Sequence, residues 1–254
     1  MPKKKRAADA AQKQQNEGFI YQFMFVLIVV LAAVMLLHGV QKYYSYVSYM
    51  DLIASASAWA AIGCAVLGAA GLIASAATGK KALWQAGALL LLAAACTGCI
   101  YGYYTDGVTM SYVMVIGAGV LCMAAKIYPP EFQLLAGVSG IAAVCYYGIS
   151  RYAGEQVWNG YTAPLVIALA VVLAAVLALT ALAGKHDGRL KLGRWSLVLW
   201  QSKLSQMLLI LVCVVWAALL ALIFALGATF AWYCVLVAAL VIFALTVWFT
   251  IKLM

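Results

Sequence analysis

The feature that most constrains this chain is a series of apolar runs, each close to the length of a membrane crossing. A helix of about 20 apolar residues spans the ~30 Å hydrocarbon core of a bilayer, and lipid offers the backbone no other hydrogen-bond partner. The 254 residues are 68% hydrophobic and 9% charged, whereas soluble domains are about 25% charged. The sequence therefore predicts an all-α integral membrane protein with no soluble domain.

Eight such runs predict a polytopic bundle of eight membrane-spanning helices joined by short loops. Turn or helix-start residues mark several breaks, including Gly79-Lys80-Lys81, Asp106-Gly107 and Pro129-Pro130. The last apolar stretch is divided at 227–229 because one undivided helix would be too long for a bilayer. A basic tail at 1–18 precedes a single transmembrane domain at 19–254, with expected spans 19–40, 52–78, 82–104, 108–125, 132–150, 165–183, 204–226 and 229–251.

The basic residues give an independent prediction of orientation. Of the sixteen lysines and arginines, all but Lys42 and Arg151 fall on the side of the N-terminus when eight spans alternate. Because cytoplasmic loops carry the excess of Lys and Arg, both termini are predicted to be cytoplasmic. Short loops and this composition favour a plasma membrane, specifically a bacterial cytoplasmic membrane.

Two basic clusters predict contact with anionic lipids, Lys3-Arg6 in the tail and Arg189-Arg194 in the loop at 184–203. Interleaved apolar residues suit the second cluster to the inner membrane surface, with a basic loop running into the next helix as the alternative. The basic residues are scattered rather than gathered on one face, so no nucleic-acid partner is predicted. A membrane-protein partner or a homo-oligomer fits the small-residue helices described below.

The tyrosines form the main candidate binding surface. Of fifteen, all but Tyr21 and Tyr128 project to the outer ends of helices or to outer loops. An interfacial aromatic belt would populate both sides, and tryptophans supply the inner side, so a belt combined with packing is the alternative to a binding surface. Tyrosine offers a rigid contact surface with a polar tip, suited to solutes or lipid headgroups. The candidate ligand-binding residues are Tyr43, Tyr46, Tyr101, Tyr104, Tyr147, Tyr161, Asp106 and Arg151.

A second candidate is the CxxC pair Cys96 and Cys99, in the stretch CTGCIYGYYTDG. Membrane thiol oxidoreductases use such pairs. Here the pair approaches a helix C-terminus in apolar surroundings, and both conditions disfavour the thiolate. A thiol–disulfide oxidoreductase is therefore only a remote alternative, and no cofactor or metal ligand set is predicted.

The segment Gly137-Val138-Ser139-Gly140 reads GxSG and resembles the nucleophile motif of rhomboid intramembrane proteases. That resemblance implies Ser139 as a nucleophile and a histidine base from a later membrane helix. No histidine lies in any span after Ser139, and a serine needs a base within hydrogen-bond reach. We interpret the motif as small-residue packing and expect the protein not to be an enzyme.

Small residues on several spans predict close helix packing, since lipid supplies no hydrophobic drive for helix pairing. Cys64, Gly68, Gly71 and Ser75 share one helix face, Gly98 and Gly102 form GxxxG, and Gly140 and Gly148 lie two turns apart. None of the seven acidic residues falls at mid-membrane depth in the predicted spans. Two functions stay open: a small-solute or lipid-headgroup binding or transport component with a tyrosine-rich outward site, and a structural or accessory subunit of a membrane complex.

Overall fold

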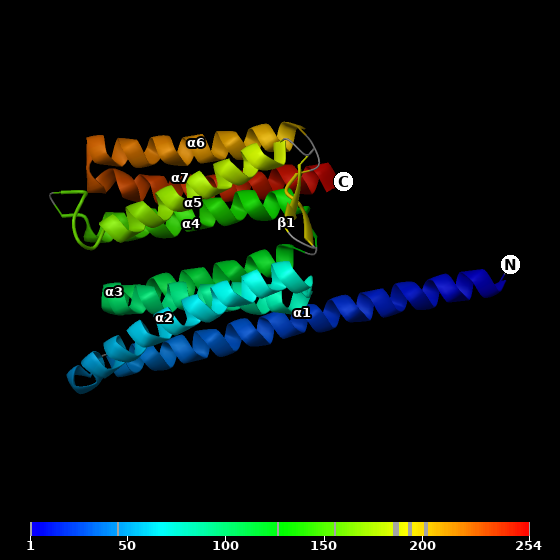
Figure 1. Ribbon diagram of the computed structural model, residues 1–254, viewed down its shortest axis with the longest axis horizontal. Helices are drawn as coiled ribbons and strands as arrows, with labels where there is room; N and C mark the ends of the chain where they lie inside the picture. Colours follow the sequence, from blue (N-terminus) through cyan, green and yellow to red (C-terminus); the bar gives the residue numbers. More distant parts are fainter. Residues whose placement is uncertain are drawn as a thin grey trace.

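The computed structural model describes the backbone of residues 2–44, 46–125, 127–154, 156–184, 188–192, 195–200 and 203–253, and the side chains of these residues except 2–19, 22, 47, 48, 81, 189–192, 195–198 and 253. The chain is a helical membrane bundle with one small hairpin (Figure 1). Its elements are α1 (Pro2–Tyr44), α2 (Val47–Thr78), α3 (Lys81–Ala124), α4 (Pro130–Tyr152), α5 (Ala163–Gly184), β1 (Arg189–Leu192), β2 (Trp195–Val198), α6 (Lys203–Leu226) and α7 (Ala228–Leu253).

All seven helices named above are long and apolar enough to cross a membrane. One of them, α3, reverses direction at Tyr104, whose φ of 52° and ψ of −125° break the helical backbone. The hydroxyl of Ser111, beyond the reversal, donates a 3.0 Å hydrogen bond to the carbonyl of Cys96 before it. The six other helices and the two antiparallel segments of α3 therefore make the eight segments that the sequence predicts.

The position of this reversal corrects one expectation. The sequence predicts a turn at Asp106-Gly107, but both residues lie in the helical segment after Tyr104. Gly107 is needed for a different reason, because a Cβ there would overlap the carbonyl oxygen of Cys99 in the neighbouring segment. The glycine therefore allows the two segments of α3 to approach closely, while a tyrosine takes the strained turn position.

The segments form two bundles, a first bundle of α1–α3 and a second bundle of α4–α7, which lie side by side in Figure 1. The main contact between them is made by α3 and α4. Gly148 on α4 leaves room there, since a Cβ at Gly148 would overlap Leu165 of α5 and lie 2.8 Å from the Met110 side chain of α3. Apolar residues of both bundles share one buried cluster around this contact.

All connections fall at the two ends of the bundles. We call one end the tyrosine end: it holds the Tyr104 reversal, the turn after Tyr44, the loop 153–162 and the turn at Gly227. The opposite end, which we call the basic end, holds both chain termini (Figure 1). Helix α1 starts at Pro2, so the expected tail is helical over 2–18 and continuous with the first span.

The first bundle is held by glycine. A Cβ at Gly68 of α2 would lie 3.0 Å from the Leu91 side chain of α3, and one at Gly87 of α3 would lie 3.0 Å from the carbonyl oxygen of Gly68. The prediction of a small-residue contact face on α2 is therefore confirmed at Gly68. The predicted GxxxG contact on α3 is wrong, because an added Cβ at Gly98 or Gly102 would meet no described residue within 4 Å.

The second bundle has a core of large side chains. Trp216 and Ile223 of α6, Tyr146 of α4 and Phe249 of α7 are each less than 2% exposed. Helix α4 is its axis, because 56% of the residues in the most apolar stretch of α4 are buried, compared with 22–28% for α5, α6 and α7. Close side-chain packing therefore dominates here.

At the basic end, the loop between α5 and α6 folds into a two-stranded antiparallel hairpin, in which Arg189 pairs with Val198 and Leu192 with Trp195. The sequence predicts a surface segment or a basic loop here, not strands. The residues that follow, Leu199 and Trp200, are buried against Phe132 and Phe249, so this connection covers the core. The basic side chains of the two predicted lipid contacts, Lys3-Arg6 and Arg189-Arg194, lie outside the described residues.

Candidate functional site

The tyrosine end contains a hydrogen-bonded cluster that joins the two bundles. We call it the tyrosine clasp and define it as Tyr103, Asp106, Arg151, Tyr152 and Tyr161. The Tyr103 hydroxyl donates to the Tyr161 carbonyl at 2.6 Å, and the Tyr152 hydroxyl lies 3.0 Å from the Tyr103 carbonyl and 2.9 Å from Asp106 Oδ2. The clasp thus ties α3 to the end of α4 and to the loop that follows it.

Local sequence positions each part of the clasp. The reversal at Tyr104 places Asp106 next to Tyr103 and toward α4, where Arg151 Nε lies 3.5 Å from Asp106 Oδ2. The loop after Tyr152 is shaped by Asn159, whose side-chain amide donates to the Tyr152 carbonyl at 2.8 Å. The Asn159 side-chain oxygen also accepts the backbone N–H of Tyr161 at 2.9 Å, an Asx-type turn that precedes α5.

Three of the eight candidate ligand-binding residues therefore meet in the clasp, Asp106, Arg151 and Tyr161. The other five do not join them. Tyr104 packs edge-on against Tyr44, with ring centroids 6.2 Å apart, and Tyr43 packs against Tyr49 at 5.9 Å. Tyr147 contacts Trp232 of α7 at 6.2 Å, and Tyr46 and Tyr101 are exposed.

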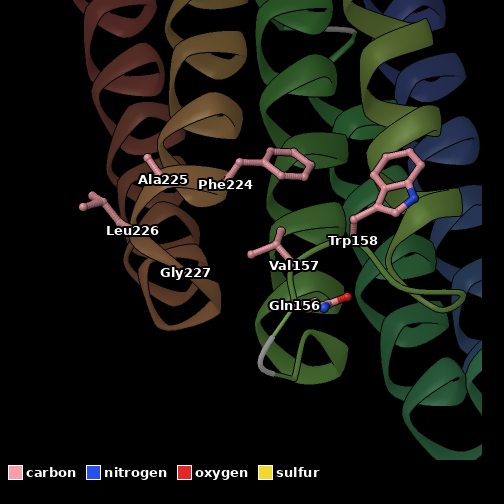
Figure 2. Close-up of a pocket in the computed structure, with 7 residues that line it drawn as sticks. All are labelled: Gln156, Val157, Trp158, Phe224, Ala225, Leu226 and Gly227. Atoms are coloured by element: carbon pink, nitrogen blue, oxygen red, sulfur yellow. The ribbon is translucent and has the colours of Figure 1, made fainter.

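A surface depression lies elsewhere at the tyrosine end, between the loop 153–162 and the turn from α6 to α7. Its volume is about 600 Å³, and it is open to the surface. Figure 2 shows Phe224 projecting from the end of α6 toward the loop that carries Val157 and Trp158, so that the helix end forms one wall and the loop forms the other. It contains none of the candidate ligand-binding residues; its lining residues are Gln156, Val157, Trp158, Phe224, Ala225, Leu226 and Gly227.

Cys96 and Cys99 lie on α3 close to the contact between its two segments. Cys96 is buried and Cys99 is half-buried, and both are free thiols in this structure. Cys99 also packs against the apolar cluster shared by the two bundles. Both cysteines thus have packing roles, and a redox role for the pair stays a prediction.

Ser139, the serine of the GxSG segment, is fully buried inside the second bundle. Its hydroxyl donates to the Leu135 carbonyl at 2.8 Å and accepts a hydrogen bond from Trp216 Nε1 at 3.3 Å. About two helical turns further along α4, the Tyr146 hydroxyl donates to the Trp216 carbonyl at 2.6 Å. Ser139 and Tyr146 therefore connect α4 to α6 through the same tryptophan.

A buried polar contact at the basic end was not predicted from the sequence. Glu131 lies in the first turn of α4, where an anion suits the helix N-terminus, yet it is only 3% exposed. Its Oε2 accepts a 2.6 Å hydrogen bond from the Ser205 hydroxyl of α6 and lies 3.8 Å from Lys252 Nζ of α7. The only sequence signal is that a carboxylate, a serine and a lysine each stand at a helix end on the same predicted side.

Glu131, Ser139 and Tyr146 share one face of α4, since they are separated by eight and seven residues. The side chains on this face form hydrogen bonds with α6, at Ser205 and at Trp216. A polar seam therefore runs along the interface of α4 and α6 inside the second bundle. Within the described part of the chain, no three His, Cys, Asp or Glu side chains are grouped so that they could hold a metal ion.

Comparison with protein-family models, with curated proteins and with solved structures finds no match for this chain.

Proposed function

We propose that this multi-pass membrane protein is a non-enzymatic accessory subunit, in which the second bundle is a packed anchor and α1 and α2 pack against the helices of another membrane protein. The observation that carries this proposal is the unequal burial of the helices. In their most apolar stretches, 6% of the residues of α1 and 11% of those of α2 are buried, compared with 56% for α4.

The polar groups of the chain support the same conclusion. The clasp tyrosines and Asp106 are engaged with one another, and Ser139 is engaged with Leu135 and Trp216. A nucleophile needs a base within reach, and the described contacts of Ser139 are a carbonyl and an indole. These groups therefore act in our proposal as internal connections rather than as catalytic groups.

The basic end is assigned to the cytoplasm in this proposal, because the positive-inside rule places Lys- and Arg-rich loops there. The membrane is then a plasma membrane, of the bacterial cytoplasmic type, with Lys3-Arg6 and Arg189-Arg194 next to anionic lipid. The tyrosine end faces outward.

Photo-crosslinking in intact cells tests the proposed partner. A photoreactive amino acid replaces Phe25 of α1 or Leu67 of α2, which are 67% and 61% exposed, and the matched controls are Phe243 of α7 and Val171 of α5, which are 67% and 60% exposed. We expect a discrete protein adduct of fixed mass from Phe25 and Leu67 alone. Lipid adducts at all four positions would contradict the proposal, and an adduct of twice the chain mass would identify a homo-oligomer instead.

Binding or transport of a small solute at the tyrosine end is a second candidate. It is favoured by the Asp106–Arg151 pair, whose side chains are 30% and 63% exposed beside two tyrosines. This candidate predicts that a solute protects Arg151 or Tyr161 from chemical modification in purified protein. The accessory-subunit proposal predicts that modification is unchanged by solutes and slowed only when the partner is present.

A further inference from the structure

The depression at the tyrosine end has walls that suit a particular kind of ligand. The rings of Trp158 and Phe224 lie 6.4 Å apart at an interplanar angle of 35°, and about half of each side chain is exposed. Val157 is buried between them and forms the floor (Figure 2). Aromatic faces carry partial negative charge, so they attract organic cations within about 6 Å of the ring.

The remaining wall is the C-terminal end of α6, from Phe224 to Gly227. The last four carbonyl groups of a helix accept no hydrogen bond from an N–H group within the helix, and they carry partial negative charge. The Gly227 N–H, at a φ of 91°, reaches back to the carbonyl of Ile223 at 2.9 Å and caps one of them. On the α7 side of the turn, the Phe230 N–H donates to the Gly227 carbonyl at 3.1 Å.

None of the seven lining residues is ionisable; their polar groups are the Gln156 amide and the main chain. An anion would find no lysine or arginine in this lining and would face helix carbonyls, which disfavour it. An organic ammonium group would meet two aromatic faces and those carbonyls. The depression thus discriminates between ligands by the sign of their charge.

The location of the depression favours a lipid as the source of the ammonium group. The depression lies where α6 ends and α7 begins, at an end of the membrane-spanning segments, and tryptophan at that level is typical of the membrane–water interface. We propose that it binds the ammonium headgroup of a phospholipid such as phosphatidylethanolamine. This inference goes beyond the accessory-subunit proposal and does not depend on it.

Native mass spectrometry of the detergent-purified protein tests the site by titration with phosphatidylethanolamine and with phosphatidylglycerol of the same acyl chains. We expect one phosphatidylethanolamine molecule to bind with a preference that Trp158→Leu and Phe224→Leu each weaken by about two- to fivefold, the range of an exposed cation–π contact. Trp232→Leu is the matched control, because Trp232 is similarly exposed and packs against Tyr147 outside the depression.

Competition with small molecules distinguishes recognition of the ammonium headgroup from recognition of the rest of the lipid. Ethanolamine should displace the bound phosphatidylethanolamine, whereas the uncharged alcohol propanol should not; equal displacement by both would overturn ammonium recognition. Equal binding of the two lipids, or unchanged lipid binding in both Trp158→Leu and Phe224→Leu, would overturn the site. Protein that binds ethanolamine but shows no preference for the ethanolamine lipid would overturn the assignment to lipid.

Discussion

The first and second bundles contain the same number of membrane-crossing segments, but they are held together by different residues. In the first bundle, α2 and α3 approach through Gly68 and Gly87, and the reversal of α3 depends on Gly107. In the second bundle, Trp216, Tyr146 and their neighbours fill the centre, and the polar seam of α4 runs beside them.

Both ways of holding helices together suit a protein surrounded by lipid. Lipid tails are as apolar as leucine, so helix pairing depends on van der Waals contact and interhelical hydrogen bonds instead of on hydrophobic burial. Glycine supplies the contact by bringing backbones together, while buried polar groups supply hydrogen bonds. The first bundle uses mainly glycine contacts, with hydrogen bonds such as that of Ser111 to the Cys96 carbonyl beside them. Its outer helices α1 and α2 are largely exposed.

The largest expected effect is at Gly107, where the first bundle depends on contact between backbones. Gly107→Val places a branched side chain against the carbonyl of Cys99, which cannot move without shifting the helix. We expect a loss of at least about 3 kcal/mol in the free energy of unfolding, the upper range for overpacking. The midpoint of unfolding by sodium dodecyl sulfate measures it.

Gly102→Val on the same helix is the control, because an added Cβ there meets no described residue within 4 Å. Its effect should stay within about 1 kcal/mol, the scale of helix propensity. Similar losses in the two variants would mean that the close approach at Gly107 does not hold the first bundle together.

The next effect tests the polar seam of the second bundle at Glu131. Ser205→Ala removes the 2.6 Å hydrogen bond to Glu131 Oε2, a contact that is buried on both sides. Because a buried acceptor oxygen loses a donor away from water, we expect destabilisation of about 2 kcal/mol. The same detergent-unfolding midpoint is the measurement.

Lys252→Met provides the comparison, since it removes another partner of the same oxygen, at 3.8 Å, from a side chain that is about half exposed. We expect a smaller loss than for Ser205→Ala, because water screens the exposed lysine end of this long contact and methionine retains the apolar contact of the lysine stem. A larger loss in Lys252→Met than in Ser205→Ala would show that charge, rather than the buried hydrogen bond, stabilises this end.

The segments of both bundles could be predicted from sequence because membrane crossing has a fixed length and a strict hydrogen-bonding requirement. The reversal of α3 could not be placed, because Tyr104 occupies a positive-φ position that normally indicates glycine, while the nearby Gly107 serves packing. Likewise, GxxxG at Gly98 and Gly102 has the spacing of a contact but no neighbour within the described chain.

The candidate site was harder to predict because its residues meet only when helices far apart in sequence are placed together. The sequence indicates that tyrosines gather at one end. It cannot indicate that Tyr103 and Tyr152, neither of them a candidate, carry the hydrogen bonds of the clasp. The burial of Glu131 could not be predicted for the same reason, since its contacts with Ser205 and Lys252 join other helices.

A smaller effect is expected where the two bundles meet. Tyr152→Phe removes the hydroxyl that lies between Asp106 Oδ2 and the Tyr103 carbonyl, so the clasp loses about one net hydrogen bond, or about 1 kcal/mol. Tyr147→Phe on the same helix is the control, because its hydroxyl makes no hydrogen bond to any described residue. Equal unfolding midpoints for the two variants would show that the clasp does not join the bundles.

The smallest effect is expected for Arg151→Gln, which removes only the charged contact of the clasp. The side chain is 63% exposed and its Nε lies 3.5 Å from Asp106 Oδ2, so water and salt screen the pair. We expect a change below about 0.5 kcal/mol at low salt, and it should disappear when the salt concentration is raised. Because Asp106 keeps its hydrogen bond from Tyr152, the two bundles should stay joined. A loss as large as that of Tyr152→Phe, unchanged by salt, would mean that the ion pair rather than the tyrosine hydroxyl is what joins the bundles at this end.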